Sequence, residues 1–250
     1  MKNTHFPFAP KARQSGFTIV EMMVALAISM IVLLGFAVTF VNIKQTFVSQ
    51  DKITQLQDNE RLAMTILTAS AQQAGYFPNP ATLDSTQIMA TDLGTYGAMP
   101  KSLAVMGTPG PPESLSMAFA ASANDGLITC QGHTITAADI AAAPSTANGS
   151  VSVRNIFYVD STANTLNCIT LINNTTTSSY GGGLAQPLIT NVSSMSVRYG
   201  VGSGSVTGYW PASGVSDWTT VKSLRVTLNF VNPNSTTTIP WVQTINLLNR

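Results

Sequence analysis

A long, predominantly hydrophobic run occurs near the start of the chain. No charged residue occurs from Met22 to Ile43, and Glu21 is the one charged position directly before this run. At ~1.5 Å per residue, a helix of this length spans about 33 Å, enough to cross a bilayer. The pattern therefore predicts a membrane-length helix that begins near Phe17.

Beyond this run the pattern becomes amphipathic without a break. Apolar or small residues recur at steps of three, four or seven, the spacing of one helix face, at Ile53, Leu56, Ala63, Ile66, Leu67, Ser70 and Ala74. The charged residues fall mainly off this stripe, at Lys44, Asp51, Lys52, Asp58, Glu60 and Arg61. No proline interrupts residues 17–73, and Gly75 followed by Pro78 is typical of a helix end. We expect one continuous helix; the alternative is two helices with a hinge near Gly35 or Asn42.

Strand patterns dominate the second half of the chain. Residues 76–114 are rich in proline and glycine and predict an excursion with little regular structure. Strands are expected at Leu115–Ala120, Leu127–Cys130, Val151–Val159, Thr165–Ile172, Met195–Tyr199, Ser223–Phe230 and Trp241–Leu248. Loops are expected at Pro144–Ser150, Asn173–Gly183, Gly200–Ser216 and Asn232–Thr238. The expected fold class is α+β: a long N-terminal α-helix, with a membrane half and an amphipathic half, packed on an antiparallel β-sheet head.

Charge and composition narrow the function classes. Charged residues make up 9% of the chain, against about 25% in an average soluble protein. Without Lys2, Lys11 and Arg13 the chain keeps 9 basic and 11 acidic residues, a net charge of −2. This balance gives no basic field for binding nucleic acid. The three early basic residues predict a cytoplasmic N-terminus, with everything after the apolar run on the far side of the membrane.

Glu21 is the unusual residue in the apolar segment. A carboxylate within hydrocarbon is costly unless it is paired, so an acidic residue here is a functional candidate. The alternative is that Glu21 lies close enough to the membrane interface to stay hydrated.

The segment Arg13-Gln14-Ser15-Gly16-Phe17-Thr18-Ile19-Val20-Glu21 resembles the class III signal of type IV pilins and pseudopilins. In that family a membrane peptidase cuts after the glycine and methylates the new N-terminal phenylalanine, and the glutamate draws subunits together. The resemblance implies a cut between Gly16 and Phe17, N-methylation of Phe17, and an assembly role for Glu21. A new amino group at Phe17 is a cation that can neutralise Glu21 of a neighbouring subunit.

Further segments are similar to PilW-type minor pilins: Asn59-x-Arg61, Ala74-Gly75-Tyr76, Cys130-Gln131-Gly132, Leu166-Asn167-Cys168, Trp218 to Val226, and a terminal Leu-Leu-Asn-Arg. The resemblance implies a division into a cleaved leader (1–16), a transmembrane and assembly half of the helix (17–43), an amphipathic half (44–75), and a β-rich periplasmic or extracellular head (76–250).

The function that this resemblance implies is that of a minor type IV pilin, a structural and assembly subunit with a role in priming or tip formation. The alternatives are a pseudopilin of a type II secretion system and an adhesive tip module of the pilus. The implied partners are the prepilin peptidase and methylase, other major and minor pilins, and the inner-membrane pilus assembly machinery. We expect the protein to be a single-pass inner-membrane protein before assembly, and to be part of a pilus at the cell surface afterwards.

Cys130 and Cys168 are the two cysteines of the chain. The predicted topology puts both in an oxidising compartment, so we expect a disulfide, with two buried thiols as the alternative. The closed loop of about 38 residues would contribute roughly 3–4 kcal/mol in the chain-entropy model.

Catalytic chemistry has little support in the sequence. His133 is the one histidine left after the leader, and its sole acidic neighbour in the sequence is Asp139. No catalytic motif, metal-ligand spacing or cofactor motif is evident, so no enzyme activity, metal or cofactor is expected. Tyr209, Trp210 and Trp218 flank a glycine-rich loop, where they form either a contact surface for a partner or, as we favour, internal packing.

Overall fold

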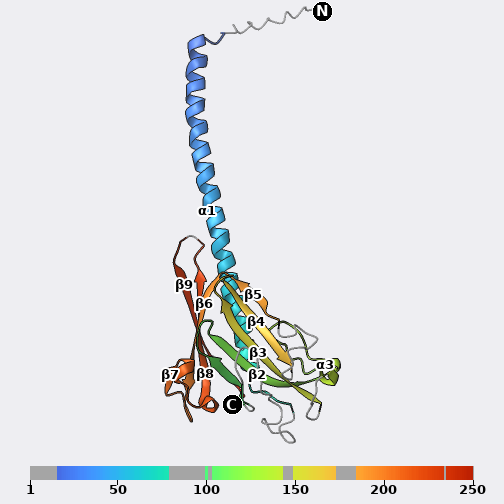
Figure 1. Ribbon diagram of the computed structural model, residues 1–250. Coiled ribbons are helices and arrows are strands. Elements are labelled where there is room, and N and C mark those ends of the chain that lie inside the picture. Colours follow the sequence, from blue (N-terminus) through green and yellow to red (C-terminus); the bar gives the residue numbers. More distant parts are fainter. Residues whose placement is uncertain are drawn as a thin grey trace, which may run out of the picture. The chain divides into compact units, whose positions relative to one another are not determined.

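The computed structural model describes residues 16–78, 99–100, 103–142, 149–172, 184–233 and 235–249. The chain divides into an N-terminal unit, Met1–Asp51, and a C-terminal unit, Lys52–Arg250. Helix α1, Ile19–Gln73, contributes its first part to one unit and its last part to the other. The predicted α+β class, a long N-terminal helix with antiparallel strands, is confirmed (Figure 1).

Helix α1 is continuous over 55 residues, so the alternative of two helices with a hinge is wrong. Its C-terminal end is held by residues far away in the sequence. Gly75 follows the helix with a φ of +79°, a left-handed conformation that favours glycine. The Gly75 N–H donates to the Ala118 carbonyl (2.8 Å). The Asn249 side-chain amide donates to the carbonyls of Gln72 (3.0 Å) and Ala74 (3.4 Å), which the helix itself leaves unpaired.

Strands β1 to β5 form a five-stranded antiparallel sheet in sequence order. Their bounds are β1 Val105–Thr108, β2 Ser114–Ser122, β3 Ser150–Asp160, β4 Thr165–Ile172 and β5 Gln186–Thr190. The β3–β4 hairpin forms where it was expected, and β4 has the predicted bounds.

The remaining strands form a second sheet of four, in the order β7-β6-β8-β9. Their bounds are β6 Val192–Val201, β7 Gly208–Trp210, β8 Val221–Val231 and β9 Thr238–Asn246. The expectation of a single sheet was therefore wrong. Asn191 separates β5 from β6 with a φ of +65°, and β6 pairs with β8 instead of continuing the first sheet. Periodicity within a strand carries no information on which sheet the strand joins.

Several local predictions also differ from the structure. The predicted strand Leu127–Cys130 is irregular apart from an isolated bridge between Ile128 and Thr134. Strand β1 lies in the predicted excursion, strand β7 and a 3-10 helix, Ala212–Gly214, lie in the predicted Gly200–Ser216 loop, and helix α3, Ala137–Ala142, was not predicted. These are short elements, whose pairing partners stabilise them more than their own patterns do. The predicted loop Asn173–Gly183 lies outside the described residues.

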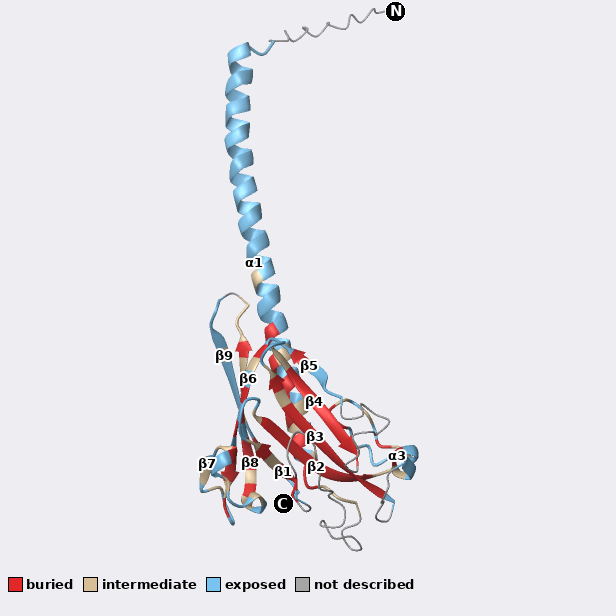
Figure 2. Ribbon diagram, viewed as in Figure 1, coloured by how far each residue is buried: buried red, intermediate tan, exposed pale blue. Residues whose placement is uncertain are grey.

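The main core of the C-terminal unit joins α1 to both sheets. Helix residues Leu56, Ala63 and Leu67 pack in one cluster with Phe157 of β3 and Leu224 of β8. Figure 2 shows this part of α1 and the middle strands as buried. The part of α1 from Leu56 onward therefore packs on the sheets as expected, whereas Ile53 of the predicted stripe is 41% exposed.

Candidate functional site

The first turn of α1 is capped by its own sequence. The Glu21 N–H donates to the Thr18 side-chain oxygen (3.3 Å) and the Thr18 carbonyl (3.1 Å), so Thr18 is the N-cap residue. Glu21 stands three residues later, where the positive end of the helix dipole favours a carboxylate. The Thr-x-x-Glu pattern is the sequence signal of such a cap, and our reading of the sequence had missed it.

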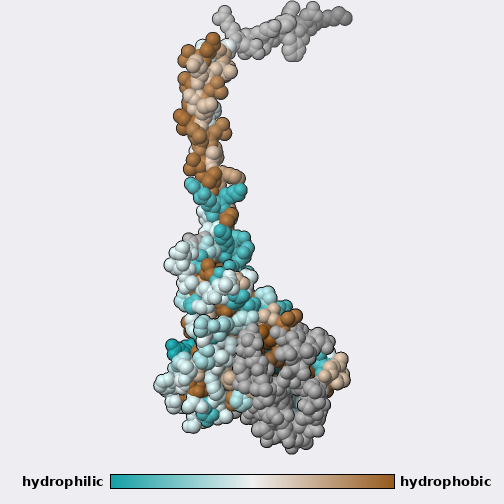
Figure 3. Space-filling model, viewed as in Figure 1, coloured by the Kyte–Doolittle hydropathy of each residue, from teal (hydrophilic) through white to brown (hydrophobic). Residues whose placement is uncertain are grey.

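Within the N-terminal unit, the surface of α1 from Met22 to Ile43 is almost wholly apolar. Phe17 is 80% exposed, and the large apolar side chains from Ile19 to Ile43 are all exposed. Figure 3 shows the same stretch as a continuous hydrophobic surface. Among the described residues, α1 is the one helix that is long and apolar enough to cross a membrane. A surface of this kind requires lipid or other apolar chains around it.

The structure joins Cys130 and Cys168 by a disulfide, as expected, with their Cα atoms 6.3 Å apart. Cys168 lies on β4, whereas Cys130 lies on the irregular segment after β2. Asn155 of β3 supports this segment, because its side-chain oxygen accepts hydrogen bonds from the Cys130 N–H (3.3 Å) and the Thr170 hydroxyl (3.1 Å). The bridge thus attaches a long connection to the middle of the first sheet.

His133 forms a hydrogen bond with Asp139 at the start of α3, with His133 Nε2 3.0 Å from Asp139 Oδ2. The Thr136 N–H and hydroxyl both donate to the same carboxylate oxygen, each at 2.7 Å. Burial raises the pKa of Asp139, but the hydrogen bonds from Thr136 and then His133 outweigh it and lower the pKa. These contacts cap a short helix. Within the described ranges no group of three or more His, Cys, Asp or Glu side chains is placed to hold a metal.

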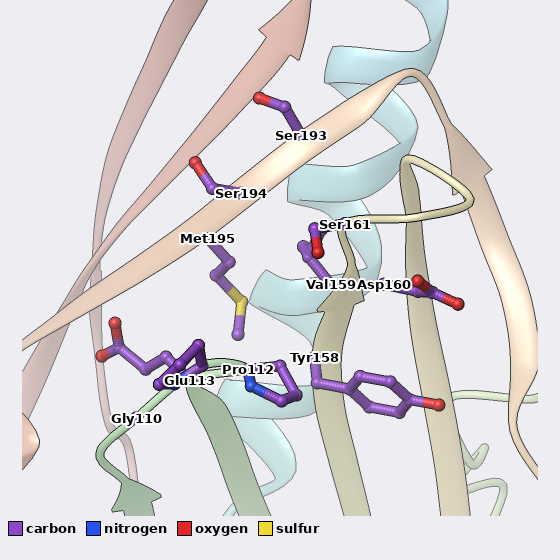
Figure 4. A pocket seen from close by; sticks show the side chains of 11 residues that line it. Gly110, Pro112, Glu113, Tyr158, Val159, Asp160, Ser161, Ser193, Ser194 and Met195 are labelled. Atoms are coloured by element: carbon purple, nitrogen blue, oxygen red, sulfur yellow. The ribbon is translucent and has the colours of Figure 1, made fainter.

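A cavity of about 450 Å³ opens where the β1–β2 connection, the β3–β4 turn and the start of β6 meet (Figure 4). Glu113 is the half-buried acid of this cavity, and its carboxylate accepts the Val197 N–H (3.1 Å). Burial raises the pKa of Glu113, and the Val197 N–H and the Arg198 charge oppose that rise. Because its carboxylate is used to hold β6, the residue has a structural role.

Of the three aromatic residues near the glycine-rich loop, two pack against other side chains and one is exposed. Trp218 packs edge-on against the buried Tyr199, with ring centroids 4.8 Å apart. The Arg225 guanidinium lies over the Tyr209 ring, 4.1 Å from the ring centre. The Tyr209 hydroxyl also forms a hydrogen bond with the Ser223 hydroxyl. Trp210 is 53% exposed. The favoured packing interpretation therefore holds for Trp218 and Tyr209, and Trp210 is the exposed exception.

Glu60 departs from the expected pattern. It was placed off the apolar stripe, yet it is 4% exposed. Leu56 and Met64 lie one turn before and after it, so Glu60 is in the middle of the buried face. The four-residue spacing of Leu56, Glu60 and Met64 is the sequence signal that places Glu60 on the buried face of the helix.

An exposed apolar helix with one carboxylate in its first turn, followed by a disulfide-linked β head, is a pilin-like arrangement. Residues 11–37 match the family model described as the prokaryotic N-terminal methylation motif. Residues 156–248 match the model of the type IV pilus-assembly protein W, PilW, which covers strands β4 to β9 and part of β3. No curated protein sequence matches the chain as a relative. The two family matches together support a minor type IV pilin that functions in pilus assembly.

Proposed function

We propose that this minor type IV pilin is made as a precursor, cut between Gly16 and Phe17, and methylated on Phe17. Residues 17–43 anchor it in the inner membrane, and residues 44–75 carry the head, 76–250, on the periplasmic side. The observation that supports this is the exposed apolar surface of α1, on which Glu21 is the single charge between Phe17 and Ile43. After assembly the same surface is buried against other subunits in the fibre.

Charge pairing explains why Glu21 is retained in an apolar segment. Cleavage creates a positively charged amine at Phe17, one helical turn from Glu21. In low dielectric an unpaired charge is expensive, so the amine of one subunit and the carboxylate of the next stabilise each other on contact. This interaction sets the axial position at which a subunit enters the fibre. The partners are the prepilin peptidase and methylase, other pilins, and the inner-membrane assembly machinery.

The processing step is tested by intact-mass measurement of the chain purified from cells that carry its own pilus genes. We expect the loss of residues 1–16 and the addition of one methyl group, located on Phe17 by fragmentation. A retained Met1, or a cut at another position, would show that the proposal is wrong.

The role of Glu21 is tested by Glu21→Val. Processing should be unchanged, and the amount recovered in sheared pili should fall at least about tenfold, because the amine of the neighbour loses its partner. Ser29→Val is the matched control, since it removes a polar group from the same apolar segment without changing charge. Equal incorporation of Glu21→Val and the wild type contradicts the pairing mechanism.

A role in priming is tested by deletion of the gene. A priming subunit acts at initiation, so we expect fewer pili per cell with unchanged length. Normal piliation with loss of protein secretion would instead identify a pseudopilin of a type II secretion system.

A further inference from the structure

A groove of about 700 Å³ lies in the C-terminal unit between α1 and strand β9. The helix lines it with Gln57, Glu60, Arg61, Met64, Thr65, Thr68, Ala69 and Gln72, and the strand with Trp241 and Gln243. Gln243 donates a hydrogen bond to the Thr68 hydroxyl (3.2 Å), which fixes the strand against the helix. The groove is therefore bounded by two regular elements and does not depend on a loop.

Glu60 is the chemically unusual residue of this groove. Its side chain is 4% exposed and borders the groove. Burial raises the pKa of Glu60, and no neighbouring cation opposes this rise. Arg61 also lines the groove but makes no ion pair with Glu60. Because Glu60 lines an open groove and no cation within the described residues lowers its pKa, the site is complementary to a cation from outside.

Strand β9 offers a second, independent feature. It is the edge strand of its sheet, bonded on one side to β8, so the backbone groups of its other side have no strand partner. Figure 2 shows most of β9 as exposed, and Trp241 is 42% exposed. Pro240 removes one donor near the start of the strand, which leaves Trp241 to Asn246 as the pairing edge. An unprotected edge of this kind is a template for strand addition.

We propose that β9 and its groove bind an extended segment of a different protein, which pairs with β9 as a fifth strand and places a Lys or Arg on Glu60. An added strand would lie about 4.8 Å from β9, and alternate side chains would point to the groove face that Trp241 and Gln243 share. A Lys or Arg at one of these positions would direct its charge toward the groove that Glu60 borders.

A second copy of this chain does not fit the same role. The edge strands that the structure describes are β1, β5, β7 and β9, and none of them contains a Lys or Arg. In edge-to-edge pairing of two copies through these strands, the added strand would therefore bring no Lys or Arg to Glu60. The partner is therefore another protein with a basic extended segment. This binding surface goes beyond the proposed function, which rests on the N-terminal segment.

The test places a photo-crosslinking amino acid, p-benzoylphenylalanine, at Trp241 of the full-length chain in cells that carry its own pilus genes. Trp210 is the matched control, because it is also an exposed tryptophan on an edge strand of the same sheet. We expect position 241, and not 210, to yield a product with an extended segment of another protein. Peptide mass spectrometry should find a Lys or Arg in this segment within a few residues of the attachment point.

The role of the Glu60 charge is tested in the same crosslinking assay. Glu60→Gln keeps the shape of the side chain and should lower the yield at position 241 at least about tenfold, because the partner's cation loses its carboxylate. Asp58→Asn, an exposed change on the same helix, should leave the yield unchanged. Glu60→Lys combined with Lys→Glu or Arg→Glu in the identified segment should restore it.

Each of four results overturns the proposal: no protein product at position 241, the same product at both positions, a product with a second copy of this chain, or a yield that Glu60→Gln does not change. Thermal unfolding of each purified variant, matched to the wild type, shows that a lost product does not reflect a misfolded chain.

Discussion

Gly75 joins the end of α1 to both β2 and the C-terminal residues, and its replacement by alanine tests that junction. The residue has a φ of +79°, and its N–H bonds to the Ala118 carbonyl. A Cβ atom added here would overlap the backbone carbonyl oxygen of Asn249 and lie 3.0 Å from the Ala104 side chain. Neither obstacle is a flexible side-chain end, so the backbone itself must move.

The expected loss has two parts. An alanine in the left-handed region costs about 1–2 kcal/mol. Displacement of Asn249 weakens two hydrogen bonds to helix carbonyls, each contributing about 0.5–1.5 kcal/mol. The sum is about 2–5 kcal/mol, or a fall in Tm of about 4–20 °C at the ~2–4 °C per kcal/mol of a domain this size.

Gly126→Ala is the control, because Gly126 has a φ of +76° and open space around its Cβ position. It carries the conformational cost alone, so we expect a loss of about 1–2 kcal/mol. Both variants are compared by urea and thermal unfolding of the full chain in detergent, followed by tryptophan fluorescence. A Gly75→Ala variant that is no less stable than Gly126→Ala would refute the clash with Asn249.

Three further outcomes follow from the C-terminal unit. Replacement of Cys130 and Cys168 by serine should lower the free energy of unfolding by about 3–4 kcal/mol, read from the urea midpoint, and equal midpoints would mean that the bridge adds no stability. Tyr199→Phe should raise Tm by about 2–6 °C, because the buried Tyr199 hydroxyl has no hydrogen-bond partner among the described residues, and a lower Tm would contradict this. The pKa of Asp139 is lowered from its usual 3.8, so its stabilisation is present above that value and is lost as pH falls through the folded-state pKa. Asp139→Asn should therefore destabilise the chain at pH 7 and differ progressively less from the wild type below about pH 4, as measured by Tm against pH.

The sequence alone predicted the features that are written in contiguous residues. A charge-free run, its amphipathic continuation and the Gly75 stop are sufficient for α1, because helix hydrogen bonds join residues four apart. The order Gly16, Phe17, Glu21 predicts the processing and assembly segment in the same way. Strand β4 was also predicted with its bounds, since a clear turn precedes its apolar run.

Only the tertiary structure decided the features that depend on distant residues. The capping of α1 by Asn249 and the packing of Glu60 beside β9 require chain segments more than a hundred residues apart to meet. The division of the strands into two sheets depends on which strands pair with each other. A period of two places a side chain on one face of a strand, but it does not select the partner strand. Glu60 has the helical spacing of a core residue and the chemistry of a surface residue, and packing of the C-terminal unit decided between them. The physical reason is that helical order is local, whereas sheet pairing and burial are fixed by which distant segments bury each other.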